Sequence, residues 1–228
     1  MSELVYNYGQ LWISGIITTV SLTILAIIIA LFLSLALAWL KLKEYSVISG
    51  IIDIYLYLVR GTPFLIQLFL IYYGSGQISW INNSFLGDIF ANAFISGLIA
   101  LIINSTAYAT VLIYGGLQNL NRDELLSAKA SGLSSWQSFI YIMLPSLFYR
   151  IFPAYINEMI MVLKCSALVS TITVLDITGS AQEIISDSYQ SLNTLLIAAV
   201  FYLLITLILA VPTKAIFSWM FNKRFKRI

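Results

Sequence analysis

Hydrophobic residues gather in five long runs that are separated by shorter polar segments. A membrane-spanning helix needs about 20 consecutive, mostly apolar residues. Runs of this kind cover residues 11–40, 54–73, 89–117, 147–171 and 193–217. The pattern predicts an all-α integral membrane protein with five transmembrane helices.

Basic residues fall on only one side of these predicted spans. The segments after the first, third and fifth spans, together with the span ends that border them, carry Lys41, Lys43, Arg122, Lys129, Arg150, Lys214, Lys223, Arg224, Lys226 and Arg227. The opposite segments carry Glu3, Asp88, Asp176, Glu183 and Asp187, without Lys or Arg. Since short cytoplasmic loops are enriched in Lys and Arg, we expect the N-terminus outside and the C-terminus in the cytoplasm.

Composition narrows the function classes. Hydrophobic residues make up 60% of the chain and charged residues 10%, against roughly 25% charged in soluble domains. The chain has no His and only one Cys, Cys165, which argues against a metal centre, a His-based catalytic triad and an internal disulfide. We expect no cofactor bound by this chain, and the net charge of +2 gives no reason to expect a nucleic-acid partner.

The N-terminus lacks the positive region of a signal peptide, so no cleavage is expected. The sequence contains neither a linker nor an internal repeat. We therefore expect a single transmembrane domain over residues 1–228.

One cytoplasmic segment, residues 118–145 between the third and fourth spans, has a readable local structure. Ser134 with Gln137 forms a capping-box pattern, and Asn121 with Glu124 forms another. Gly132 lies between them, where a helix end favours a residue that can take a positive φ. Pro145 is expected to end the second piece. The segment therefore predicts a helix, a glycine turn and a second helix.

Residues 127–132, followed after nine residues by 142–145, resemble the cytoplasmic EAA coupling loop of ABC importer permeases. The glutamate that opens the family motif falls on Leu126 here. The resemblance implies that this loop docks on a separate ATPase subunit. The residues expected to make this contact are Ser127, Ala128, Gly132, Leu133, Ile142, Leu144 and Pro145.

Further segments, residues 60–63, 67–74, 104–108 and 157–170, resemble the polar amino acid branch of that family, and arginine-importer permeases in particular. A common pattern of the branch has an acid, an Arg and an Asp where this chain has Val111, Tyr114 and Cys165. The resemblance implies a multi-pass protein of the bacterial inner membrane. It also implies a second permease subunit, identical or paralogous, and a periplasmic amino-acid-binding protein. The chain has no P-loop motif, so ATP is expected to be used by the partner ATPase.

Glu158 is the main candidate for substrate binding. A carboxylate inside a spanning helix costs on the order of 2.5–3.5 kcal/mol to insert, so it should face a protein cavity or a partner. A cation site is the functional interpretation, and an ion pair with another helix is the alternative. Lys164 lies six residues further on, roughly 120° around a helix, so the two cannot form an i, i+4 pair.

Gly61, Thr62 and Pro63 predict a break in the second span, with Thr62 capping a new helix whose free N–H groups could bind a substrate carboxylate. A kink used only for packing is the alternative. Asn104 and Asn157 can offer hydrogen bonds to a substrate, or can simply join membrane helices. The predicted substrate-binding residues are Glu158, Asn157, Asn104, Thr62 and Lys164.

Three functions compete at this point. The first is the permease subunit of an ATP-driven importer of a polar, basic amino acid such as arginine. The second is a proton-coupled secondary amino acid transporter that uses Glu158 and Lys164, although such proteins usually contain internal repeats. The third is a non-transporting membrane scaffold that binds partners through the loop 118–145.

Overall fold

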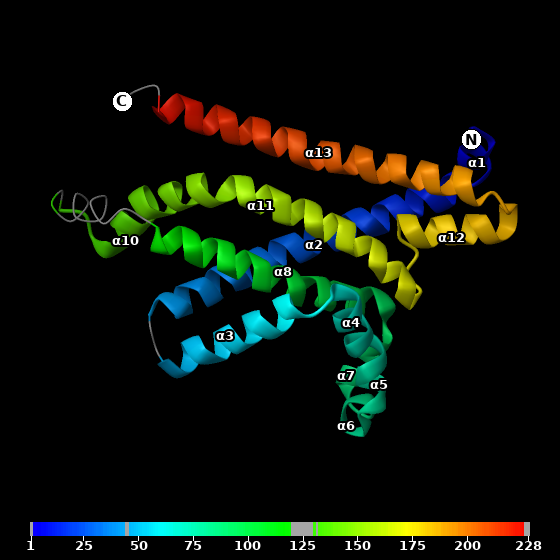
Figure 1. The fold of residues 1–228 in the computed structure, drawn as a ribbon, viewed down its shortest axis with the longest axis horizontal. Coiled ribbons are helices and arrows are strands. Elements are labelled where there is room, and N and C mark those ends of the chain that lie inside the picture. The colour runs from blue at the N-terminus through cyan, green and yellow to red at the C-terminus, as the bar shows by residue number, and fades with distance from the viewer. Residues whose placement is uncertain (1, 44–45, 120–129, 131, 226–228) are drawn as a thin grey trace.

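A computed structural model describes residues 2–43, 46–119, 130 and 132–225. All regular structure within these residues is helical (Figure 1). Helices α1 (Ser2–Asn7) and α12 (Ile177–Ser188) lie at one end of the molecule, while α10 (Ser135–Ser138) and the last described turns of α13 (Ser191–Phe225) lie at the other. This arrangement agrees with the predicted placement of the two termini on opposite sides of a membrane.

In the part of the chain that the structure describes, four helices are long and apolar enough to cross a membrane, at Gly9–Leu42, Ala93–Gln118, Ile140–Ile172 and Ser191–Ser218. They correspond to the first, third, fourth and fifth predicted runs. The second run is a pair of helical segments, Val47–Gly61 and Phe64–Gln77, bent by 107°. The predicted break at residues 61–63 is therefore confirmed, and the described residues contain the five predicted spans when the bent pair is counted as one.

The helical elements follow one another with few connecting residues. In chain order they are α1 (Ser2–Asn7), α2 (Gly9–Leu42), α3 (Ser46–Gly61), α4 (Phe64–Phe69), a π-helical turn (Leu70–Gly74), α5 (Ser75–Gln77), α6 (Ser79–Asn82), α7 (Phe85–Ala91), α8 (Ala93–Gln118), α10, a second π-helical turn (Phe139–Met143), α11 (Leu144–Ser166), a 3₁₀ turn (Ala167–Ile172), α12 and α13 (Ser191–Phe225).

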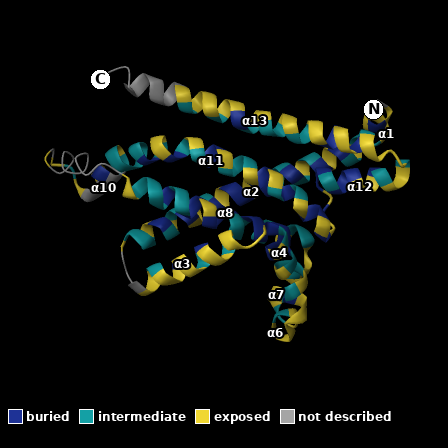
Figure 2. Cartoon of the chain, in the orientation of Figure 1, coloured by how far each residue is buried: buried dark blue, intermediate teal, exposed yellow. Residues whose placement is uncertain are grey.

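The core forms where α2, α8 and α11 pack against one another, and buried residues gather along this contact (Figure 2). Leu22, Ala26 and Ala30 follow one another at intervals of four and are fully buried, so one stripe of α2 faces its neighbours. The alanines let the helix axes approach closely, as is usual between membrane helices. Gly97 of α8 serves the same purpose, because a Cβ there would lie 2.3 Å from the Cγ1 atom of Val169.

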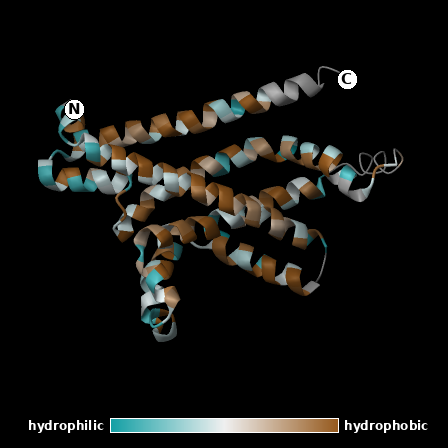
Figure 3. Cartoon of the chain, turned by 180° about the vertical axis from the view of Figure 1, so that it is seen from behind, coloured by the Kyte–Doolittle hydropathy of each residue, from teal (hydrophilic) through white to brown (hydrophobic). Residues whose placement is uncertain are grey.

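The outer surface of the helices is apolar. Figure 3 shows hydrophobic residues along most of α2 and α13. On α13, Leu203, Ile208 and Val211 are all more than half exposed. Such a surface is costly in water and matches a hydrocarbon environment.

Helix α12 is fixed to α2 and α13 by a buried polar network. The Asp176 carboxylate caps α12 by accepting a hydrogen bond from the Gly179 N–H at 2.8 Å, and it accepts a second from the Tyr202 hydroxyl at 3.0 Å. The Ile177 N–H donates to Thr19 Oγ1 at 3.1 Å. Gly15 lets these elements meet, because a Cβ there would lie 2.5 Å from Ser180 Oγ.

The described part of the segment 118–145 contains the predicted glycine turn. Gly132 has φ of 73°, the left-handed conformation expected there. The Ser134 N–H donates to Gln137 Oε1 and the Gln137 N–H donates to Ser134 Oγ, so this capping box is confirmed. Ser127, Ala128 and the pair Asn121 and Glu124 lie outside the described residues.

The prediction for Pro145 is wrong. Pro145 does not end the second helical piece but lies in the first turn of α11, which continues from the preceding π-helical turn. The residues before it form a π-helical turn, so the regular α-helical hydrogen-bond pattern is already interrupted where the N–H of Pro145 is missing. Leu133 precedes this continuous helix, and Ile142 and Leu144 lie within it.

Candidate functional site

The break in the second span has a defined local structure. Helix α3 ends at Gly61, and α4 begins after Pro63, whose φ of −63° and ψ of 137° are extended. The Thr62 hydroxyl donates to the Leu58 carbonyl of the preceding turn at 2.8 Å. The prediction that Thr62 caps the new helix is therefore wrong: the cap position of α4 is Pro63, and the Thr62 side chain is turned back onto α3.

Gln67 holds the broken ends together. Its Nε2 atom donates to the Val59 carbonyl at 2.6 Å and to the Thr62 carbonyl at 3.0 Å, both left without helical partners by the break. Its Oε1 atom accepts from Asn104 Nδ2 at 3.0 Å. Because Gln67 is buried, these bonds replace water and fix α8 against the break.

A cavity of about 210 Å³ lies between this break, α8 and α11. It is lined by Thr62, Pro63, Phe64, Leu101, Asn104, Tyr108, Glu158, Met161, Val162 and Cys165. Three of the predicted substrate-binding residues, Glu158, Asn104 and Thr62, are thus brought together from three separate segments.

Asn157 and Lys164 do not line this cavity, and both are exposed on the surface of α11. Helix geometry explains the division, since consecutive residues point about 100° apart. A side chain next to Glu158 in sequence therefore faces elsewhere, and so does one that lies six residues further on.

The cavity wall combines one acid with apolar and neutral polar side chains. Glu158 is the only side chain among the cavity-lining residues that carries a formal charge at neutral pH. Its neighbours in the wall include Met161, Val162 and the aromatic ring of Tyr108. The Arg60 guanidinium lies outside the wall, 5.5 Å from the centroid of the Tyr108 ring. Such a cavity suits a small molecule with a cationic group and an apolar stem.

Sequence reasoning missed several members of this site. Tyr108 follows Asn104 by four residues, and Met161 and Cys165 follow Glu158 by three and seven, so each lies on the same helix face as a predicted residue. This periodicity could have identified them. In the described part of the chain, no three His, Cys, Asp or Glu side chains gather in a way that could hold a metal ion.

Apolar helices long enough to cross a membrane, with a small cavity between them that contains a single acid, define a multi-span membrane protein with an internal polar site. Residues 30–223 match the family model described as "Binding-protein-dependent transport system inner membrane component". The chain belongs to this family and is therefore a multi-pass permease protein of the inner membrane. This finding decides against the secondary transporter.

Within this family, the chain is similar to permease proteins of amino acid ABC transporters. The chain is 39% identical over 200 residues to the arginine ABC transporter permease protein ArtM of Haemophilus influenzae, covering 88% of each chain. It is 32% identical over 217 residues to the histidine/lysine/arginine/ornithine transport system permease protein HisM of Escherichia coli K12, covering 92% of this chain and 91% of the relative. A crystal structure of an amino acid ABC transporter with histidines superposes with a TM-score of 0.80 at 33% identity, covering 96% of both chains.

Proposed function

We propose that this chain is the permease subunit of an importer for a basic amino acid such as arginine, and that Glu158 receives the cationic group of the substrate. The single observation that supports this most strongly is the position of Glu158 as the only formally charged lining residue of the 210 Å³ cavity. The names of the relatives agree with it, because arginine, lysine and ornithine are all cationic.

The chemistry of the wall fits this substrate class. A carboxylate binds a guanidinium through two parallel hydrogen bonds, which gives both strength and orientation. The low polarity of Met161 and Val162 strengthens that interaction by keeping water away. Thr62 and Asn104 add a hydroxyl and an amide to the cavity wall, and the Asn104 Nδ2 group already donates to Gln67.

Energy is supplied by a separate ATPase subunit in this proposal, and the segment around Gly132 is the site of contact. A positive-φ glycine followed by the closed capping box of Ser134 and Gln137, at the start of α10, gives a stiff surface for docking. Ser127, Ala128, Leu133, Ile142, Leu144 and Pro145 complete the proposed contact. A second permease subunit, a periplasmic amino-acid-binding protein and the surrounding lipid are the other partners, and this chain binds no cofactor.

Glu158→Gln is the direct test. The substitution keeps the side-chain volume and removes the charge. Breaking a buried ion pair by removing one partner typically costs about 3–5 kcal/mol, so arginine uptake should fall at least tenfold. The complex of permease, ATPase and binding protein is reconstituted in proteoliposomes, and arginine accumulation is measured at saturating binding protein.

Glu183→Gln is the matched control, because Glu183 is an exposed acid on α12. It should transport at the wild-type rate. The proposal is overturned if the Glu158→Gln complex assembles normally and still accumulates arginine at the wild-type rate.

A further inference from the structure

A second, larger cavity adjoins the first one. Its volume is about 790 Å³, and it lies between the C-terminal end of α2, helix α3 and the C-terminal half of α8. Thr62 lines both cavities, so the two meet at the break in the second span. Lys41 lies at the predicted cytoplasmic end of the first span, so the larger cavity is on the cytoplasmic side of the smaller one.

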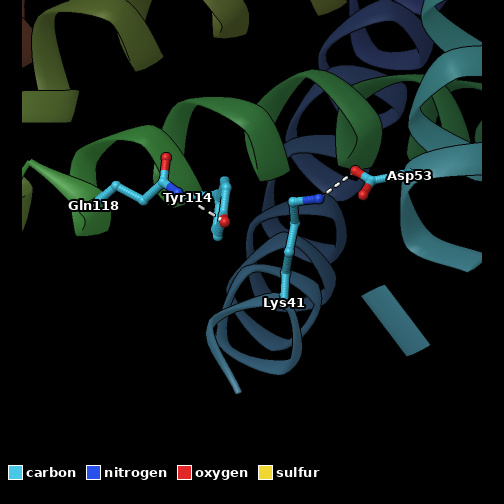
Figure 4. A network of polar contacts seen from close by, with 4 residues as sticks. All are labelled: Lys41, Asp53, Tyr114 and Gln118. Carbon is cyan, nitrogen blue, oxygen red and sulfur yellow. Dashed lines mark hydrogen bonds and ion pairs between the residues drawn. The ribbon is translucent and has the colours of Figure 1, made fainter. Parts of the chain in front are cut away.

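An ion pair lies in the wall of this second cavity (Figure 4). The Lys41 ammonium group of α2 donates to the Asp53 carboxylate of α3. Lys41 Nζ is also 5.0 Å from the centroid of the Tyr114 ring, whose hydroxyl accepts a hydrogen bond from Gln118 at 2.8 Å. The ammonium group thus has both a carboxylate and an aromatic face as partners.

The two partners differ in their access to the cavity. The Lys41 side chain is 11% exposed, whereas the Asp53 side chain is 57% exposed. The lysine is therefore enclosed by protein, and the carboxylate is open to an incoming group. Because the exposed partner is the carboxylate, an incoming cation can compete with Lys41 for Asp53, and the enclosed Lys41 ammonium keeps the face of the Tyr114 ring as its second partner.

We infer that Asp53 is a second binding station for the cationic group of the substrate, on the cytoplasmic side of Glu158. This inference rests on the proposed function. With no substrate present, Lys41 occupies the carboxylate. A guanidinium that leaves Glu158 past Thr62 takes the place of Lys41, which keeps its contact with the Tyr114 ring.

The surroundings of Asp53 favour weak binding of a cationic substrate, as a site along a transport path requires. Arg60 lines the same cavity, so two fixed cations surround a single carboxylate among its lining residues. Net positive charge shortens the stay of a cationic substrate and favours its release. A site along a transport path has to bind well enough to admit the substrate and weakly enough to let it leave.

Two variants distinguish substrate binding by Asp53 from a purely structural ion pair between α2 and α3. Asp53→Asn removes the carboxylate, and Lys41→Asp combined with Asp53→Lys exchanges the two charges. The exchange restores an ion pair between α2 and α3. It does not restore a carboxylate on α3 that could bind the cationic group of the substrate. Arginine accumulation by the reconstituted complex should fall about fivefold in both variants, the factor that corresponds to roughly 1 kcal/mol at a half-exposed site.

Complex recovery and ATPase activity are measured in parallel and should stay at the wild-type level. Wild-type uptake by Asp53→Asn, or by the exchanged pair, overturns the inference. If the variant with exchanged charges does not assemble, Lys41→Met is used instead. This substitution breaks the ion pair but keeps the Asp53 carboxylate. Arginine uptake well above that of Asp53→Asn then supports the second binding station. An equal loss in Lys41→Met and Asp53→Asn overturns it.

The outcomes also separate this inference from the proposed function. The proposed function fails if the wild-type complex does not accumulate arginine, or if Glu158→Gln retains full uptake. The second station alone fails if Glu158→Gln is defective while the exchanged pair transports normally.

Discussion

Asp176 makes the stability of the outer end of the molecule depend on pH. Its side chain is fully buried at the start of α12, between α2 and α13. Burial raises the pKa of its carboxyl from the ordinary value of 3.8 to about 6, although hydrogen bonds from Gly179 and Tyr202 oppose this shift. The carboxylate is needed as a helix cap, but its ionised form is poorly solvated.

The sign and size of the effect follow from the pKa values of the folded and unfolded states. The folded state binds the proton more tightly, so stability is greatest below about pH 4 and falls as the pH rises to about 6. The difference of about two pKa units, at about 1.36 kcal/mol each, amounts to about 3 kcal/mol. Asp176→Asn abolishes this titration while keeping an oxygen that can accept from the Gly179 N–H.

Thermal unfolding of the purified protein in detergent, between pH 4.5 and 7.5, measures this effect. We expect the midpoint of wild-type unfolding to fall by several degrees over this range, and that of Asp176→Asn to change less and to equal or exceed the wild type at pH 7.5. Asp88→Asn is the control, because Asp88 is an exposed acid of α7 and its replacement should leave the wild-type slope unchanged. An equal slope in wild type and Asp176→Asn would refute the reasoning.

Two further substitutions test the close helix packing and the coupling loop. Gly97→Ala places a Cβ 2.3 Å from Val169 Cγ1, so overpacking should cost about 1–3 kcal/mol; adding Val169→Ala should recover part of the lost thermal stability, and no recovery would argue against this contact. Gly132→Val forces a β-branched residue into φ of 73°, at a cost of about 1–3 kcal/mol, so less ATPase should co-purify although the spans still insert. Gly132→Asn, which tolerates this conformation, should keep the ATPase, and full ATPase recovery with Gly132→Val would contradict the docking role.

The fold was largely predictable because membrane insertion depends on local composition. Each apolar run has to satisfy its own backbone hydrogen bonds in lipid, so a run of sufficient length specifies a helix without any knowledge of its neighbours. The break at Gly61 and the turn at Gly132 were predictable for the same reason, since backbone conformation there depends on one or two residues.

The predictions for Pro145 and Thr62 were wrong because each local sequence pattern is compatible with two backbone arrangements. Proline is compatible with the end of one helix and with the first turn of the next, and the choice at Pro145 depends on whether the preceding π-helical turn continues into α11. Thr62 likewise can cap a helix that follows or bond to the helix that precedes. Its bond to the Leu58 carbonyl is favoured in this chain because Pro63 has no N–H and takes the cap position itself.

The candidate site was only partly predictable. Glu158 was identified because the cost of inserting a carboxylate is a property of that residue alone. Gln67 gave no comparable signal, since a neutral amide in an apolar run is ordinary between membrane helices. Its contacts with Val59 and Asn104 exist only because the chain bends by 107° at the break, and that angle is set by tertiary packing.

The bend also explains why one short segment contacts both cavities. A continuous helix would present Thr62 to a single neighbour. At the break, Thr62 lies at a corner, with the Glu158 cavity on one side and the Lys41–Asp53 cavity on the other. Because Gln67 ties this corner to Asn104 of α8, a movement of α8 relative to α3 would change both cavities together. A single corner that lines two carboxylate-bearing cavities is the simplest way for one helix movement to close the first station while it opens the second.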